Sequence, residues 1–173
     1  MKEVRCCVSG SFKFKPHIDQ VITLFEGVEF KVLSPVKGGL FYPDSDDFFW
    51  TPGSYPLVTE RRMSEMQAKG SHIEEIKRSN FTYFITDDSG YIGKDSAREA
   101  RVGAKVGPIY ASGRVNPNLD LGADWAKFTE NFEIRTPEQV VARWKYIFEK
   151  TRNLWLPTAF LLEKYEMEQV KSA

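Results

Sequence analysis

Glu99 lies in the motif Ser96-Ala97-Arg98-Glu99, after a strand-like run and the turn that follows it. A carboxylate in the first turn of a helix at a sheet edge can act as a nucleophile or a base toward a ligand in the adjacent cleft. The Ser-x-x-Glu spacing is also that of a capping box, in which Glu99 would accept from the backbone amide of Ser96. Both interpretations are open from the sequence alone.

A second polar segment follows the first strand-like run and reads Ser9-Gly10-Ser11-Phe12-Lys13. Glycine allows a tight turn, and the amides and hydroxyls beside it can bind a phosphate or a sugar hydroxyl. The spacing is neither that of a dinucleotide-binding fingerprint nor that of a P-loop, which excludes both classes on this segment. Gly10 could also serve only the turn, and Lys13 could be an ordinary solvated lysine.

A third segment reads Asp87-Asp88-Ser89-Gly90-Tyr91-Ile92-Gly93 and connects a strand-like run to the helix of Glu99. We take as candidate ligand-binding residues here and at the helix start Asp87, Gly90, Tyr91, Gly93 and Ser96. Asp87 and Asp88 have an alternative role, because aspartates commonly build such turns through their own side chains.

The hydrophobic pattern predicts the scaffold that would position these segments. Apolar, β-prone runs predict strands over residues 4–9, 29–33, 80–86, 109–111 and 131–135. Helical spacing and capping signals predict helices over 16–27, 59–78 with a break near Gly70, 96–106, from Thr136 onward, and over about 154–170. Residues 36–58 are irregular, which is typical of a functional loop.

Strands that alternate with helices predict an α/β fold with a Rossmann-like, flavodoxin-like parallel sheet of four or five strands flanked by helices. We expect one domain over 1–173, with a C-terminal helical tail at about 154–173. Ligands bind such sheets outside the carboxyl ends of the strands, where the strand order reverses. The three polar segments are therefore expected to meet at this edge.

The composition limits the classes of molecule that the protein could bind and the compartment in which it is expected. Lys and Arg together equal Asp and Glu at 24 each, so there is no electrostatic footprint for nucleic acid polymers or for an anionic membrane. No apolar run approaches the ~20 residues that span a bilayer, and the first residues do not read as a secretory signal. The adjacent Cys6 and Cys7 suit a reducing compartment and a core position, so we expect a cytoplasmic protein. No metal motif and no cofactor is indicated.

The motifs, taken in order, resemble those of the nucleoside 2-deoxyribosyltransferase-like superfamily, which includes nucleoside 5′-monophosphate N-glycosidases. The resemblance covers roughly residues 4–111. It is carried by Ser-Gly-Ser after the first strand, His-Ile-x-x-Ile-Lys-x-Ser-Asn-Phe-x-Tyr, Gly-Tyr-Ile-Gly, Ser-Ala-x-Glu and Gly-x-Pro-Ile-Tyr.

The resemblance implies an enzyme that cleaves or transfers at the N-glycosidic bond of a nucleoside or nucleoside 5′-monophosphate. It implies Glu99 as the nucleophile that attacks the anomeric carbon, and the Ser9 to Lys13 turn as the grip on the 5′-phosphate. It also implies a homodimer or higher homo-oligomer.

Two positions depart from the family pattern. His72 takes the place of a family aspartate, and as a histidine it could act as an acid or base or could simply be a packed helix residue. Arg101 stands where a small or apolar residue is usual. These departures favour an alternative, a non-catalytic nucleotide sensor on the same fold.

Aromatic side chains suggest two further roles. The 41–55 loop could close over a nucleobase by stacking, or could form an oligomer contact. A homo-oligomeric interaction domain is the other alternative, and it rests on the aromatic residues of the C-terminal part: Trp144, Tyr146, Phe148, Trp155, Phe160 and Tyr165.

Overall fold

A five-stranded sheet, in which every strand is parallel to its neighbours, forms the centre of the molecule. The computed structural model describes residues 2–35, 48–49, 63–153 and 157–173. The strands follow the order β2-β1-β5-β6-β7, with bounds Arg5–Ser9 for β1, Lys31–Ser34 for β2, Phe81–Phe84 for β5, Ile109–Ala111 for β6 and Phe132–Ile134 for β7. The predicted Rossmann-like α/β fold is confirmed.

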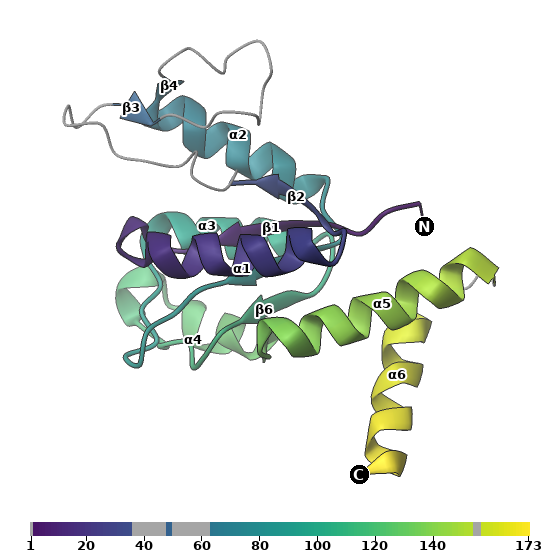
Figure 1. Cartoon of the computed structure of the whole chain (residues 1–173). Coiled ribbons are helices and arrows are strands. Elements are labelled where there is room, and N and C mark those ends of the chain that lie inside the picture. Colours follow the sequence, from purple (N-terminus) through teal and green to yellow (C-terminus); the bar gives the residue numbers. More distant parts are fainter. Residues whose placement is uncertain (1, 36–47, 50–62, 154–156) are drawn as a thin grey trace.

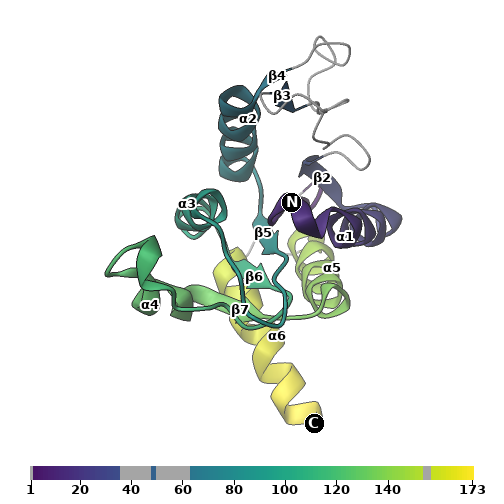
Figure 2. The same cartoon turned by 90° about the vertical axis from the view of Figure 1, so that its left-hand side faces the viewer.

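Helices cover both faces of this sheet (Figures 1 and 2). One face carries α1 and α5, with bounds Lys15–Gly27 and Pro137–Asn153. The other carries α2, α3 and the short α4, with bounds Glu65–Lys77, Lys94–Gly103 and Trp125–Phe128. The last helix, α6 (Thr158–Ser172), packs on α5 and its C-terminal end projects away from the sheet (Figure 1).

Five short elements complete the described chain: η1 (Phe12–Phe14), η3 (Leu119–Leu121), η4 (Thr129–Asn131), and the strands β3 (Phe48–Phe49) and β4 (Met63–Ser64), which form an antiparallel pair. Two predictions about this region need correction. The helix expected over 59–78 begins at Glu65 after β4, and α2 runs through Gly70 without a break. The rest of the 36–58 segment lies outside the described residues.

The alternation of side chains along each strand divides the core into two clusters. On the α1 and α5 face, Phe81 and Tyr83 pack with α1 and with Trp144, whose ring stacks on Phe81 at a centroid distance of 5.1 Å. On the α3 and α4 face, Phe84 and Ala111 pack with Ala100 and Trp125. Trp144 is almost fully buried, so this one of the C-terminal aromatic residues belongs to the core and does not support an interaction domain.

Cys6 and Cys7 are free thiols that are both fully buried in β1, as the core interpretation predicted. Burial raises the pKa of the Cys7 thiol well above its ordinary value, and the nearby carboxylates of Glu75 and Glu99 add to the effect. A thiol held in its neutral form is a poor nucleophile. We therefore assign Cys7 a packing role in the core.

Candidate functional site

The strand order reverses direction at β1, which lies between β2 and β5. In an open parallel sheet this is the position where a ligand crevice forms at the carboxyl ends of the strands. Ser9 is the last residue of β1 and pairs with Phe84, the last residue of β5. Ser9 follows Cys7 by two residues on the same strand, so the two side chains point to the same face of the sheet. This is the face that carries α2 and α3, whose Glu75 and Glu99 lie near Cys7.

Glu99 meets Ser9 from the opposite side. The buried face of α3 is formed by residues spaced three and four apart, Ser96, Ala97, Glu99, Ala100 and Gly103, so that Glu99 is directed toward the sheet. Gly103 allows this close packing, because a Cβ there would lie 3.1 Å from Cγ2 of Ile109. The Ser9 hydroxyl donates a hydrogen bond to Oε2 of Glu99, and both residues are buried.

The structure corrects the expected start of this helix. The N-cap of α3 is Gly93, and the helix begins at Lys94. Ser96 is therefore the third helical residue and not the cap, so the Ser-x-x-Glu spacing does not fall on the helix end. Glu99 lies in the second turn, where its carboxylate contacts a strand terminus instead of an exposed helix start.

His72 of α2 faces the same carboxylate. Its Nε2 lies 3.7 Å from Oε2 of Glu99, and the exposed fractions of the two side chains are 15% and 11%. Its other ring nitrogen, Nδ1, lies 2.6 Å from the hydroxyl oxygen of Ser34, the last residue of β2. Four elements thus bring Ser9, Ser34, His72 and Glu99 into one connected group at the carboxyl edge of the sheet.

A second polar group forms at the same edge, between η1 and the turn after β5. The Lys13 ammonium lies 3.4 Å from Oδ2 of Asp87 and 3.9 Å from the ring centroid of Tyr91. The Lys13 side chain is half exposed, so its charge is accessible but is already paired with a carboxylate. An anion that bound Lys13 would have to compete with Asp87 for it.

Asp87 builds the turn, as its alternative role predicted. Its Oδ1 accepts from the hydroxyl and amide of Ser89 and from the amide of Tyr91. These bonds, led by the Ser89 hydroxyl, lower the pKa of Asp87 to about 2, and Lys13 contributes in the same direction. Asp87 therefore remains an anion over the physiological range.

Gly90 is required at its position in this turn. Its φ is +74°, and a Cβ would lie 2.7 Å from the carbonyl oxygen of Arg114 and from the amide of Asn116. The Tyr91 ring folds back over Gly93, where a Cβ would lie 3.3 Å from the Tyr91 hydroxyl oxygen. These glycines shape the loop that leads into α3.

Of the remaining predicted residues, Gly10 packs against Ile85, and the backbone carbonyl oxygen of Ser11, just before η1, accepts from the Phe14 amide at 2.8 Å. The Phe12 side chain and the 41–55 loop, apart from the backbone of β3, lie outside the described residues. Arg101 is directed away from Glu99. Its Nη2 donates to the Leu121 carbonyl at 2.9 Å and its guanidinium lies over the Trp125 ring.

Ser34 was not among the site residues predicted from the sequence. The available signal was its position at the carboxyl end of a predicted strand beside the strand of Ser9, which places it at the same edge of the sheet. In the ranges that the structure describes, no group of three or more His, Cys, Asp or Glu side chains could hold a metal ion.

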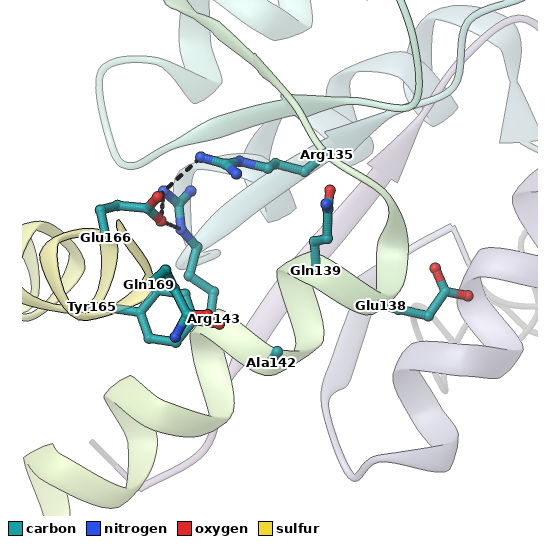
Figure 3. Close-up of a pocket in the computed structure, with 8 residues that line it drawn as sticks. All are labelled: Arg135, Glu138, Gln139, Ala142, Arg143, Tyr165, Glu166 and Gln169. Atoms are coloured by element: carbon teal, nitrogen blue, oxygen red, sulfur yellow. Dashed lines mark hydrogen bonds and ion pairs between the residues drawn. The ribbon is translucent and has the colours of Figure 1, made fainter. Parts of the chain in front are cut away.

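A separate cavity of about 470 Å³ lies between α5 and α6, on the α1 and α5 side of the molecule (Figure 3). Buried Arg143 donates from Nη1 to Glu133 at 2.6 Å and to the Tyr110 hydroxyl at 3.2 Å, and from Nε to Glu166 at 2.6 Å. Arg135 also contacts Glu166, at 3.1 Å. Because these charges neutralise one another, we interpret the group as the attachment of α6 and not as a ligand site.

Comparisons with protein-family models, with curated proteins and with solved structures gave no match for this chain. Among the described helices, none is both long and apolar enough to cross a membrane. The superfamily resemblance and homo-oligomeric association accordingly remain predictions.

Proposed function

We propose that this protein cleaves or transfers at the N-glycosidic bond of a nucleoside or nucleoside 5′-monophosphate, with Glu99 as the nucleophile. The observation that carries the proposal is the placement of a buried carboxylate, hydrogen-bonded to Ser9 and faced by His72, at the point where the strand order reverses. Such an arrangement fits covalent catalysis, because it fixes a nucleophilic oxygen beside a group that can exchange protons.

The chemistry has two steps. Oε2 or Oε1 of Glu99 forms a bond to C1′ of the sugar while the bond from C1′ to the base nitrogen breaks, and the base leaves with the electron pair and takes up a proton from the solvent. Water or a second base then attacks C1′ and gives up a proton, the ester bond to Glu99 breaks to restore the carboxylate, and the configuration at C1′ is retained. When water attacks, His72 is placed to accept its proton, since Nε2 faces the carboxylate beside which that water must approach.

The second polar group supports a substrate with a polar 5′ end. Lys13 presents an accessible ammonium at the same sheet edge, where it lies over the ring of the exposed Tyr91. A 5′-phosphate would compete with Asp87 for Lys13. We therefore expect Lys13→Ala to raise KM for monophosphates more than for nucleosides.

The test is release of free base from purified full-length protein. A panel of purine and pyrimidine ribonucleosides, deoxyribonucleosides and their 5′-monophosphates is incubated with the protein, with and without a second base, and products are separated by chromatography. We expect Glu99→Gln to lower the rate by at least about 10³-fold, as for loss of other nucleophiles. Asp95→Asn removes one carboxylate from an exposed position of the same helix and is expected to retain activity.

No base release from any substrate, or equal release by the wild type and Glu99→Gln, would contradict the catalytic proposal. The sensor alternative predicts a different pattern, namely binding without turnover. A ligand at 100 times its Kd stabilises the folded state by about 2.7 kcal/mol, so nucleotide-dependent thermal stabilisation with no free base would favour the sensor.

A further inference from the structure

The Ser34 hydroxyl contacts the ring nitrogen of His72 that points away from the carboxylate of Glu99. Ser34 ends β2 and is buried, and its Oγ lies 2.6 Å from Nδ1. Nε2 of the same ring lies 3.7 Å from Oε2 of Glu99. The imidazole therefore stands between a hydroxyl and a carboxylate, with one nitrogen directed at each.

The two neighbours have different hydrogen-bonding abilities. A carboxylate only accepts, so it favours a proton on Nε2, whereas a hydroxyl both donates and accepts. In the neutral ring with Nε2–H, Nδ1 has a lone pair and can accept from Ser34. In the cationic ring, Nδ1–H can donate to the same oxygen after the hydroxyl rotates.

The kind of group beside Nδ1 is important because His72 is largely shielded from water, so that water cannot readily serve as its hydrogen-bond partner. A carbonyl or carboxylate at Nδ1 would favour a proton there, and would leave the Nε2 lone pair of the neutral ring facing the Glu99 carboxylate. An apolar residue would leave Nδ1 without a partner, and unpaired buried polar atoms are costly. A hydroxyl satisfies Nδ1 in both protonation states of the ring.

We propose that Ser34 is a positioning residue that donates to Nδ1 of neutral His72, so that the tautomer protonated on Nε2 has a partner for each ring nitrogen, and that keeps Nδ1 paired when the ring gains or loses a proton. The tautomer assignment stands on geometry alone. Its consequence for turnover rests on the proposed function, in which His72 exchanges a proton beside Glu99.

The test reads the tautomer directly by NMR. The chain has two histidines, and the second, His17, is exposed on α1 and serves as an internal reference. Protein labelled with ¹⁵N in histidine is examined through two-bond correlations between ring carbon-bound protons and nitrogens at a pH where the ring is neutral. We expect the wild type to show an unprotonated Nδ1 and a protonated Nε2 for His72.

Three variants complete the test. Ser34→Ala should bring the two ¹⁵N shifts of His72 toward each other, as expected for a mixture of tautomers, while those of His17 stay unchanged. Ser34→Thr keeps the hydroxyl and should retain the wild-type pattern. Ser79→Ala removes the hydroxyl of an equally buried serine that donates to the Ile76 carbonyl at 2.7 Å, and it should leave His72 unchanged.

A wild-type His72 protonated on Nδ1 would overturn the proposal without any variant. An unchanged tautomer in folded Ser34→Ala would do the same. If the wild type releases base, Ser34→Ala should lower kcat by about 10- to 100-fold, a part of what a whole proton-transfer group contributes, with KM within about twofold. Absence of base release refutes the proposed function but leaves the tautomer result to decide the role of Ser34.

Discussion

Replacing Ser9 by alanine tests the central contact of the site without assuming any activity. The Ser9 hydroxyl donates to Glu99, and the two residues are only 3% and 8% exposed, so water cannot readily replace the lost donor. A hydrogen bond to a charged group contributes about 1.5–3 kcal/mol. We expect Ser9→Ala to lower the free energy of unfolding by about 2 kcal/mol, roughly a 30-fold drop in the ratio of folded to unfolded protein.

The measurement is equilibrium unfolding in urea followed by tryptophan fluorescence, since Trp125 and Trp144 are buried and will report loss of the core. A double-mutant cycle with Glu99→Gln isolates the contact. A neutral amide accepts a weaker hydrogen bond from Ser9 than a carboxylate does, so Ser9→Ala should cost about 1 kcal/mol less in the Glu99→Gln background.

Two results would refute this reasoning. A loss below about 0.5 kcal/mol in the single variant would mean that the hydroxyl does not stabilise a buried carboxylate. Equal costs in the two backgrounds, within the roughly 0.3–0.5 kcal/mol that independent sites show, would mean that Ser9 and Glu99 do not interact.

The other predictions concern the attachment of α6 and the turn before α3. Arg143→Met should lower the free energy of unfolding, measured by urea denaturation, by about 2 kcal/mol. This is less than the cost of breaking a fully buried ion pair, because Glu133 and Glu166 are partly exposed; an unchanged urea midpoint would contradict the prediction. Gly90→Ala should cost about 2 kcal/mol or more, since alanine is strained at φ +74° and its Cβ would overlap backbone atoms; a fully stable variant would show that the turn is different. Asp87 should titrate in NMR spectra with a midpoint of about 2, and Ser89→Ala should raise that midpoint. Because the folded-state pKa of Asp87 is lowered, its ionised form stabilises the turn above about pH 4 and this contribution is lost as the pH falls toward the folded-state pKa; a midpoint near 4 would contradict it.

The sequence predicted the sheet well, because its strands are short apolar runs separated by clear turn and helix signals. The predicted segments 4–9, 80–86 and 109–111 contain β1, β5 and β6. The sequence predicted a parallel α/β fold but not the order of its strands. The position of β1 between β2 and β5 depends on pairing between strands that are far apart in the chain, and the local hydrophobic pattern contains no information on that pairing.

Helix starts were predicted less well. Ser96 has the residue type and spacing of a cap, yet α3 begins two residues earlier, after Gly93. The turn fixed by Asp87 and Gly90 brings the chain to Gly93 in an extended conformation, which allows the helix to start there. The short helix of Trp125 was not predicted at all, because four residues carry too little periodicity to be recognised.

The sequence named candidate site residues, some of which the structure brings together, but it did not predict how their side chains pair. Glu99, His72 and Ser9 were candidates, and the structure brings them together. The partner of Lys13 is Asp87, which is 74 residues away, and that of His72 is Ser34, which is 38 residues away. Such contacts are set by strand register and by the packing of α2 and α3, and residue types alone do not specify them.

The distance in sequence between Ser9 and Glu99, 90 residues, has a consequence for how the chain reaches its native state. Closing so large a loop is entropically costly, and parallel pairing of β1 with β2 and β5 must also bridge whole helices before any strand contact forms. The carboxylate can find its hydroxyl partner only once these crossovers are complete. A chain that ends before residue 99 would hold Ser9, Ser34 and His72 but not Glu99, so the connected group of these four side chains should form late in folding.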